Sequence, residues 1–171
     1  VLLGQPGATP DLGFSFQFDG VSGKLDIPFS PDLNQPIFTV AFWAKPTGGA
    51  GSVRSPLTNR RGNPVGYIFY LTANDHWQFW AGDGSTWSRM DGGSAILNEW
   101  IHLVATSDGT NICFYTNGLL AATSPTMIQM TGSSPFRIGA GATEGAGQYW
   151  FPGYVDDVRV YRKPFTAADV G

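Results

Sequence analysis

The chain has 171 residues and few charges: 10 Lys and Arg against 13 Asp and Glu, which is 13% of all residues and a net charge of −3. This balance excludes the clustered basic surface that nucleic-acid binding requires, and no apolar run is long enough for insertion into a membrane. The 23 Gly, 12 Pro and 14% aromatic residues are typical of an all-β domain that turns often.

The first elements follow a Gly- and Pro-rich beginning. Residues 1–12 are predicted to be a lead-in segment without secondary structure. Residues 14–19 alternate aromatic and polar side chains, as a half-buried strand does, and end in Asp19. Residues 37–44 are the most apolar run, and we expect a central strand buried on both faces.

A hairpin is predicted in the middle of the chain. Residues 67–72 and 76–82 are two alternating strands, and Ala73-Asn74-Asp75 between them is a turn sequence. Because side chains of a strand alternate between its two faces, each strand has a core face and an outer face. The core face takes Tyr67, Phe69, Leu71, Trp77, Phe79 and Ala81, which leaves Tyr70, Gln78 and Trp80 outside.

Further short strands are expected toward the C-terminus. Residues 100–106 and 110–116 alternate in the same way, and Asn117-Gly118 is a strong signal for a second hairpin. Residues 136–139 form one more strand, after which a Gly-rich loop reaches residue 147. Roughly a dozen short strands without a helix of useful length predict an antiparallel β-sandwich of two sheets.

The closing strand is predicted at residues 154–161. Val158 and Val160 share a face with Asp156, which would place a carboxylate on the core side, where it needs a cation or N–H donors. Pairing of this strand with residues 14–19 would close the fold. It would also bring Asp19 and Asp156 within reach of one ion.

Tryptophan and histidine positions complete the core prediction. Trp43, Trp77 and Trp100 lie on or beside strongly apolar strands, and each is expected to be largely buried. His102 is expected to be half-buried and His76 exposed. Their separation gives no metal-ligand spacing.

The outward-facing aromatic residues are the best indication of a binding site. Apolar rings next to amides and a guanidinium suit a sugar, whose ring faces are apolar and whose edges carry hydroxyls. If residues 67–72, 76–82 and 110–116 share one sheet, the predicted site consists of Tyr70, Gln78, Trp80, Trp87, Arg89 and Tyr115, edged by Tyr149. The alternative is that loops or a second domain cover these rings.

Five segments in order resemble a known family: residues 18–20, 38–46, 99–105, 115–118 and 153–161. The chain resembles the laminin-G-like, concanavalin A-like jelly-roll domains. This resemblance implies one jelly-roll domain over residues 1–171. It also implies a structural calcium held by Asp156, with backbone carbonyls as most of the other ligands. We expect Asp19 to be a second side-chain ligand, because the predicted strand pairing would bring it near Asp156.

Catalytic residues are not predicted. Glycoside hydrolysis usually needs two carboxylates across the bond that is cleaved, whereas the two Glu of the chain, Glu99 and Glu144, lie in apparent turns. The acidic cluster of laminarinase-type enzymes is absent from the sequence. A glutamic peptidase on this fold would need a Gln and a Glu to meet, for which Gln78 and Glu144 are the formal equivalents.

The sequence therefore leads to a non-catalytic, lectin-like carbohydrate-binding module with a structural calcium, secreted or at the cell surface. Its expected partners are a glycan or polysaccharide and other domains of a larger chain, without nucleic acid or membrane insertion. Val1 in place of an initiating Met agrees with a piece excised from a longer protein. The alternative is a protein-adhesion or inter-domain module, and an enzyme on the same fold comes third.

Overall fold

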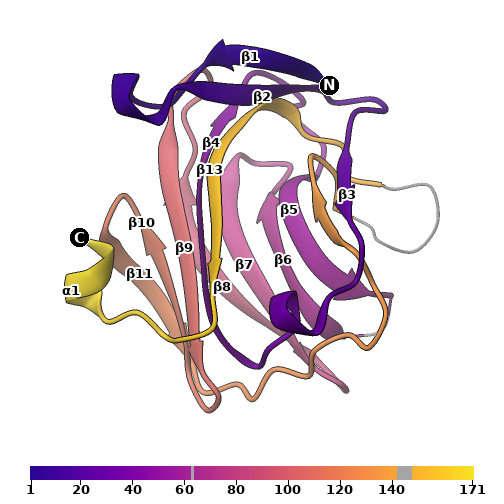
Figure 1. Ribbon diagram of the computed structural model, residues 1–171, viewed down its shortest axis with the longest axis vertical. Coiled ribbons are helices and arrows are strands. Elements are labelled where there is room, and N and C mark those ends of the chain that lie inside the picture. The colour runs from indigo at the N-terminus through magenta and orange to yellow at the C-terminus, as the bar shows by residue number, and fades with distance from the viewer. Residues whose placement is uncertain (63, 142–147) are drawn as a thin grey trace.

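A computed structural model describes residues 1–62, 64–141 and 148–171. These residues form two antiparallel sheets that pack face to face (Figure 1). Sheet A contains, in spatial order, β1 (Leu2–Pro6), β2 (Phe14–Asp19), β13 (Pro152–Tyr161), β4 (Ile37–Pro46), β9 (Ile101–Asp108), β10 (Ile112–Thr116) and β11 (Leu119–Ser124). Sheet B contains β3 (Leu25–Ile27), β12 (Phe136–Ile138), β5 (Arg54–Arg61), β6 (Val65–Leu71), β7 (His76–Asp83) and β8 (Trp87–Ser94). The predicted two-sheet sandwich is confirmed.

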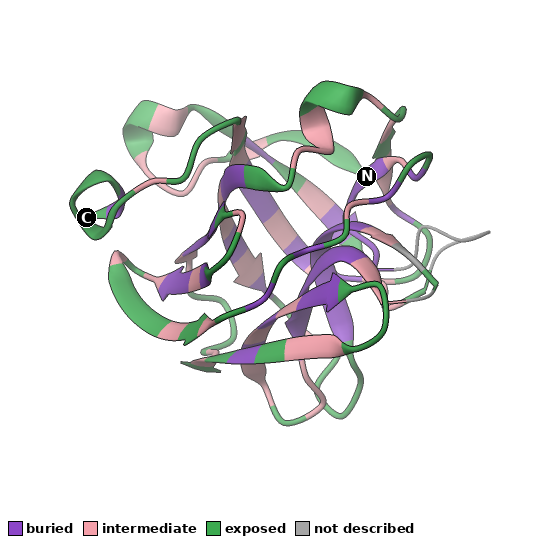
Figure 2. Cartoon of the chain, turned by 90° about the horizontal axis from the view of Figure 1, so that it is seen from below, coloured by how far each residue is buried: buried purple, intermediate pink, exposed green. Residues whose placement is uncertain are grey.

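The core lies between the two sheets, where Figure 2 shows most of the buried residues. Phe42 of β4 meets Phe69 of β6 edge to face at 4.8 Å between ring centres, and Phe69 meets Phe79 of β7 at the same distance. Such contacts between large rings supply the apolar burial that stabilises a sandwich. The predicted core face of the hairpin is therefore correct.

The hairpin formed by β6 and β7 has the register that the sequence predicts. Tyr70 lies opposite Gln78 and Ile68 lies opposite Trp80 across the two strands. Because the core residues alternate with these, all four side chains face away from the core. This register places the predicted binding residues of β6 and β7 on the outer face of sheet B.

The beginning of the chain differs from the prediction. Residues 2–6 are not an unstructured lead-in but form β1, which pairs with β2 at the edge of sheet A. Gly4, with φ of 71°, lies between the two paired regions, where the register shifts. The Gly and Pro content that suggested a loop is thus accommodated by an irregular edge strand.

The prediction that three tryptophans are largely buried holds for one of them. Trp77 is 1% exposed, whereas Trp43 and Trp100 are half-buried. The difference at Trp43 arises because β4 is central within sheet A but only one face of that sheet is covered by sheet B. The ring of Trp43 is on the other face, opposite His102.

The closing strand, β13, pairs with β2 on one side and β4 on the other, so the predicted closure of the fold is confirmed. A β-bulge between Asp156 and Arg159 changes which side chains face the core. Asp156 lies opposite Trp43 on the outer face of sheet A, while Val158 and Val160 pack against the core. The prediction that Asp156 shares their face is therefore wrong.

The chain ends in a short helix, α1 (Ala167–Val170), beyond β13. The N–H and hydroxyl groups of Thr166 donate to Asp169 Oδ2 at 2.8 and 2.7 Å, which caps the start of this helix. Two 3₁₀ turns, Pro10–Leu12 and Pro31–Leu33, precede this helix in the chain. In the described part of the chain, no helix has the length and apolar character needed to cross a membrane.

Candidate functional site

The predicted binding residues gather on the outer face of sheet B, with one exception. Cross-strand pairs align Gln78 with Asp91, Trp80 with Arg89, and Gly82 with Trp87 on β7 and β8. Tyr70 is beside them on β6, and Tyr149 lies over Tyr70. We call this group the outer patch, and it consists of Tyr70, Gln78, Trp80, Trp87, Arg89 and Tyr149.

Trp80 is the centre of the outer patch. The guanidinium of Arg89 lies 4.2 Å from the centre of the indole, and Tyr70 meets the same ring edge to face at 5.0 Å. The indole Nε1 donates a hydrogen bond of 2.9 Å to Gln78 Oε1. The ring centre of Trp87 lies 6.3 Å from that of Trp80. These contacts hold a half-buried ring in one orientation, which is a prerequisite for a platform that recognises a flat ligand.

A pocket of about 160 Å³ lies beside Trp80. It is lined by Val53, Tyr70, Thr72, Gln78, Trp80 and Tyr149. Aromatic rings form its walls, while the Gln78 amide and the Thr72 hydroxyl supply both donors and acceptors. Val53 was not predicted, because it precedes β5 and lies outside any predicted strand. Thr72 was missed although it ends the predicted strand 67–72 and lies two residues after Tyr70, so the alternation that selected Tyr70 predicts its position.

Part of the outer face is covered by the segment on either side of residues 142–147. Tyr149 meets Tyr70 edge to face at 5.4 Å between ring centres, and Tyr70 is only 6% exposed. Arg60 Nε donates to the Gly141 carbonyl at 3.1 Å, and Ile68 is fully buried although it faces away from the core. Loop coverage, which the sequence left open, therefore applies to the β6 part of this face.

Trp87 and Arg89 extend the outer patch away from this cover. Trp87 is half-buried, with the Arg60 guanidinium 5.9 Å from its ring centre, and Arg89 is exposed. Glu144, the formal partner of Gln78 in a glutamic peptidase, lies outside the described residues.

Asp91 is a polar neighbour of the outer patch that sequence reasoning missed. It lies opposite Gln78, and the imidazole of His76 is 3.3 Å from its Oδ2. Partial burial acts to raise the pKa of Asp91, but hydrogen bonds from the Gly93 N–H, Gln78 and His76 outweigh it and lower that pKa. Asp91 is two residues after Arg89, so the same alternation that selected Arg89 predicts its position.

Tyr115 does not belong to the outer patch, and this prediction is wrong. It lies on β10 of sheet A, where it is 4% exposed and packs with Val104 and Val170. The reason is topological: β9 and β10 follow sheet B strands in sequence but return to sheet A beside β4. Alternation along one strand assigns faces, but it does not assign a strand to a sheet.

Asp156 is the residue for which the family resemblance implies calcium. Its Oδ2 accepts the Ala8 N–H and its Oδ1 accepts the Asp157 N–H, each at 2.8 Å. A Cβ added to Gly7 would be 2.9 Å from Asp156 Oδ2 and 3.0 Å from the Gly13 carbonyl oxygen. Two oxygens of the kind that calcium prefers thus converge beside Gly7. In the described residues, no three His, Cys, Asp or Glu side chains form a metal-binding group.

Asp19 does not share a site with Asp156. Asp19 lies opposite Pro152, four positions before Asp156 on β13, which corresponds to roughly 13 Å along the strand. Its Oδ1 accepts the N–H groups of Val21, Ser22 and Gly23. The Ser22 N–H is the largest of the influences that lower the pKa of Asp19. The prediction that one ion is ligated by both side chains is therefore wrong.

The architecture and the outer patch define a class: antiparallel β-sandwiches that carry an aromatic, weakly charged patch on one sheet. The sequence model of the family described as the concanavalin A-like lectin/glucanases superfamily matches residues 19–171. The chain therefore belongs to this superfamily, and its sandwich is a concanavalin A-like jelly roll. A comparison with curated protein sequences gives no match.

Solved structures with the same fold include sugar-binding domains. The CBM40 module of the Ruminococcus gnavus IT-sialidase, bound to α2,3-sialyllactose, has a TM-score of 0.70 at 16% identity and covers 96% of this chain and 97% of its own. Domain 4 of AbnA, an extracellular GH43 arabinanase from Geobacillus stearothermophilus, in complex with arabinotriose, has a TM-score of 0.67 at 20% identity, covering 93% and 75%. A heptameric SAP-like pentraxin from Limulus polyphemus has a TM-score of 0.67 at 16% identity, covering 90% and 78%. At these identities the likeness shows the fold.

Proposed function

We propose that this chain is a non-catalytic carbohydrate-binding module that holds a glycan on the outer patch of sheet B and acts outside the cell. The observation that carries the proposal is the pocket between Trp80, Tyr70 and Tyr149, with the Gln78 amide at its wall. The apolar ring faces of a sugar pack on aromatic side chains. Its hydroxyls donate hydrogen bonds to an amide oxygen and accept them from an amide N–H.

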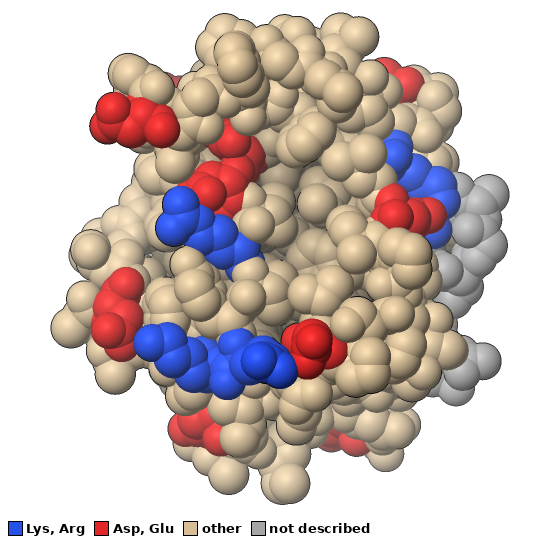
Figure 3. Space-filling model, in the orientation of Figure 1, with Lys and Arg blue, Asp and Glu red and all other residues tan. Residues whose placement is uncertain are grey.

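Two further observations support a glycan over other ligands. Basic and acidic side chains lie next to one another on the face that Figure 3 shows. In the outer patch itself, the Arg89 guanidinium lies against Trp80 and the Asp91 carboxylate lies opposite Gln78, so a polyanion is not favoured there. Two of the structurally similar proteins are domains that were solved with a bound sugar, sialyllactose in one and arabinotriose in the other.

A binding role is favoured over catalysis by what lines the pocket. Among the described residues, the six that line it include no carboxylate. Asp91, nearby, is already engaged by Gly93, Gln78 and His76. The pair of carboxylates that usual glycoside hydrolysis needs is thus not assembled by the lining of this pocket.

Replacing Trp80 with alanine is expected to abolish glycan binding at the outer patch without unfolding the domain. The ring faces away from the core and is half-buried, so its removal takes away the platform and leaves the packing between the sheets intact. Binding would be measured on a glycan array and by calorimetry with the oligosaccharides that the array selects. Affinity per site is expected to be weak, because a shallow pocket desolvates little surface.

The matched control for this experiment is Trp100→Ala. Trp100 is also half-buried, but it contacts Lys45 and Tyr154 of sheet A. This variant is expected to bind glycans as the wild type does. Glycan binding that survives at the outer patch in Trp80→Ala, followed by the NMR signals of Trp87 and Gln78, or an array without any bound glycan, would contradict the proposal.

A second candidate function is adhesion to a protein or to a neighbouring domain, and the edge of sheet A favours it. Leu3 and Phe14 of the β1–β2 pair are 67% and 73% exposed. Large apolar side chains at a sheet edge are typical of a surface that another chain covers. Replacement of both residues by Ser would separate the two functions: it removes adhesion to a partner, whereas glycan binding by the outer patch persists.

The calcium implied by the family resemblance remains a proposal, now limited to Asp156 and the nearby Gly13 carbonyl. An ion that binds the folded chain alone raises the midpoint of thermal unfolding as free calcium increases. We expect this increase in the wild type and its loss in Asp156→Asn, measured by calorimetry with calcium and with chelator. Equal midpoints of the wild type under both conditions would contradict calcium binding.

A further inference from the structure

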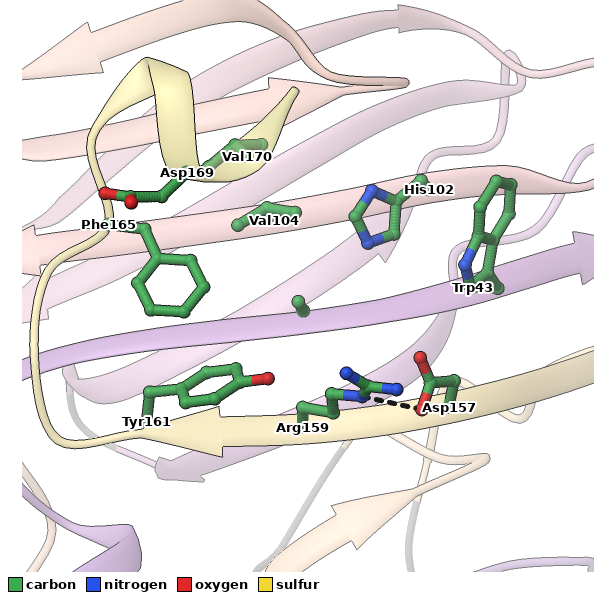
Figure 4. A pocket seen from close by; sticks show the side chains of 10 residues that line it. Trp43, His102, Val104, Asp157, Arg159, Tyr161, Phe165, Asp169 and Val170 are labelled. Atoms are coloured by element: carbon green, nitrogen blue, oxygen red, sulfur yellow. Dashed lines mark hydrogen bonds and ion pairs between the residues drawn. The ribbon is translucent and has the colours of Figure 1, made fainter. Parts of the chain in front are cut away.

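A larger pocket, of about 260 Å³, lies on the opposite side of the molecule from the outer patch, on the outer face of sheet A. Its floor is formed by Ala41 and Val104 of the central strands. Figure 4 shows Trp43 and His102 toward one end, Tyr161 and Phe165 toward the other, and Arg159 between them on β13. We call this the sheet A pocket. It is smaller than the cavities of about 300–1,000 Å³ that hold drug-sized ligands, so it suits one small unit.

Two aromatic pairs bound the sheet A pocket. Trp43 and His102 stack on each other with ring centres 5.0 Å apart, because they are direct cross-strand partners on β4 and β9. Tyr161 and Phe165 are 4.6 Å apart and join the end of β13 to the segment before α1. A flat apolar floor between aromatic walls accepts the carbon skeleton of a ring-shaped ligand.

The β-bulge in β13 places a charged pair in this pocket. Without the extra residue, Arg159 would face the core, because Asp156 already faces outward opposite Trp43. The bulge leaves Asp157 with φ of 47°, a conformation that costs energy for a residue other than glycine. Because of the bulge, Asp157 and Arg159 both line the pocket, and Arg159 Nε donates a hydrogen bond of 2.7 Å to Asp157 Oδ1.

The pocket lining carries two carboxylates and one guanidinium, and each of the three has a partner. Arg159 is paired with Asp157, and Asp169 accepts hydrogen bonds from Thr166. An anionic ligand would be repelled by the two carboxylates, and the guanidinium is already paired. A cationic ligand would have to compete with the groups that already bind the two carboxylates. The pocket therefore favours a ligand without net charge.

His102 supplies hydrogen-bonding groups that the described residues leave open. Its backbone N–H bonds to Asn117, but neither ring nitrogen has a partner in the part of the chain that the structure describes. Burial lowers the pKa of His102, the nearby Asp157 raises it and Arg159 lowers it, and the net shift is downward. The neutral ring offers one donor and one acceptor, which is what a hydroxyl group can satisfy on both sides.

We propose that the sheet A pocket is a second binding site, which takes one neutral sugar ring between the Trp43–His102 and Tyr161–Phe165 pairs, with its hydroxyls on His102, Arg159 and Asp157. The two sites lie on opposite outer faces of the sandwich. One domain would thus bind two glycan chains, and the resulting avidity offsets weak single-site affinity. Sugar binding in the sheet A pocket does not depend on the outer patch being a glycan site, whereas the avidity rests on the proposed function as well.

The test is an NMR titration of the whole chain with D-glucose, D-galactose, D-mannose and L-arabinose, one at a time, to about 100 mM, as weak single sites require. N-acetylneuraminic acid is the anionic probe. The indole N–H signals of Trp43 and Trp80 report the two sites separately. The expected result is that a neutral sugar shifts the Trp43 and His102 signals and N-acetylneuraminic acid does not.

Arg159→Ala and His102→Ala are each expected to lower the affinity measured at Trp43 by about tenfold or more. Arg162→Ala is the matched control: it removes an exposed arginine just beyond β13 that pairs with Asp32 outside the pocket, so the affinity should stay unchanged. The Arg159 side chain is 54% exposed, so its loss leaves the fold intact.

Three results would overturn the second site: no Trp43 shift with any neutral sugar, a shift with N-acetylneuraminic acid alone, or unchanged affinity in both pocket variants. The proposed function has its own readout. If the sugar shifts the Trp43 signal but not the Trp80 signal, the second site is supported and the outer patch is contradicted. If it shifts the Trp80 signal but not the Trp43 signal, the outer patch is supported and the second site is contradicted.

Discussion

Replacing Trp77 with alanine is expected to lower the free energy of unfolding by about 3–5 kcal/mol, as truncations of large aromatic residues in packed cores do. Trp77 is among the largest fully buried side chains of the described residues, at 1% exposed. It lies between the sheets within the core cluster, with Phe151 as a ring neighbour. Its removal leaves a cavity that strands fixed by hydrogen bonds on both sides cannot close.

Two variants separate cavity formation from other effects of this substitution. Trp77→Phe keeps most of the apolar contacts, and the indole N–H that it removes has no partner among the described residues, so a loss of about 1–2 kcal/mol is expected. Trp43→Ala should also cost less than Trp77→Ala, because Trp43 is half-exposed on the outer face of sheet A.

The three variants would be compared by equilibrium unfolding in urea, followed by far-UV circular dichroism, since fluorescence changes with each tryptophan removed. A cost for Trp43→Ala as large as that for Trp77→Ala would contradict the assignment of faces on β4 and β7. So would a loss below about 1 kcal/mol for Trp77→Ala.

The alternation of side chains predicted the local part of this fold well. In the β6–β7 hairpin, the core face and the outer face are as expected, because the turn at residues 73–75 fixes the register and every second residue is apolar. The same reasoning brought Gln78 and Trp80 to one side and correctly added Trp87 and Arg89 from β8.

Two features of the candidate sites depend on information that alternation does not contain. Tyr115 was placed in the wrong sheet because strands that follow one another in sequence change sheets in this topology. The bulge at Asp157 has no sequence signal of the usual kind, since a non-glycine residue takes the positive φ. For this reason Asp156 was assigned to the wrong face and the sheet A pocket was not foreseen.

Buried charge was the third feature that the sequence did not reveal. Arg54 and Arg137 are 1% and 2% exposed, although arginine is rarely buried without partners. Arg137 donates to both carboxylate oxygens of Asp26, at 2.6 and 3.1 Å. Such pairs depend on strands that are distant in sequence, here β12 and β3, so they become visible only in the folded chain.

Arg54 holds together the segments that border the outer patch. Its Nη1 donates to the Gly48 carbonyl at 2.6 Å, and its Nη2 donates to the Thr72 carbonyl at 3.0 Å and to Asp75. Gly49, with φ of 77°, packs against the alkyl part of the side chain, where a Cβ would be 2.6 Å from Arg54 Cδ. One buried guanidinium therefore ties residues 48–49 to the turn between β6 and β7.

Replacing Arg54 with alanine is expected to cost about 3–5 kcal/mol, because it leaves two backbone carbonyls and a partly buried carboxylate without their donor. Asp75→Ala should cost less, since Asp75 is 32% exposed and the carbonyl contacts of Arg54 remain. In urea unfolding, a double-mutant cycle of these two changes should give a coupling free energy of roughly 0.5–3 kcal/mol. Additive losses would contradict the ion pair.

The Arg54 substitution should also weaken glycan binding, because Arg54 positions residues that line the pocket without lining it itself. Val53 and Thr72 line the pocket beside Trp80. Val53 directly precedes Arg54 in the chain, and the Thr72 carbonyl accepts a hydrogen bond from the Arg54 guanidinium. Arg54→Ala is therefore expected to weaken binding at the outer patch under conditions where the variant is still folded, and to leave the Trp43 response of the sheet A pocket unchanged. An equal loss at both sites would instead indicate general unfolding, because no residue of the sheet A pocket lining contacts Arg54 among the described hydrogen bonds and ion pairs.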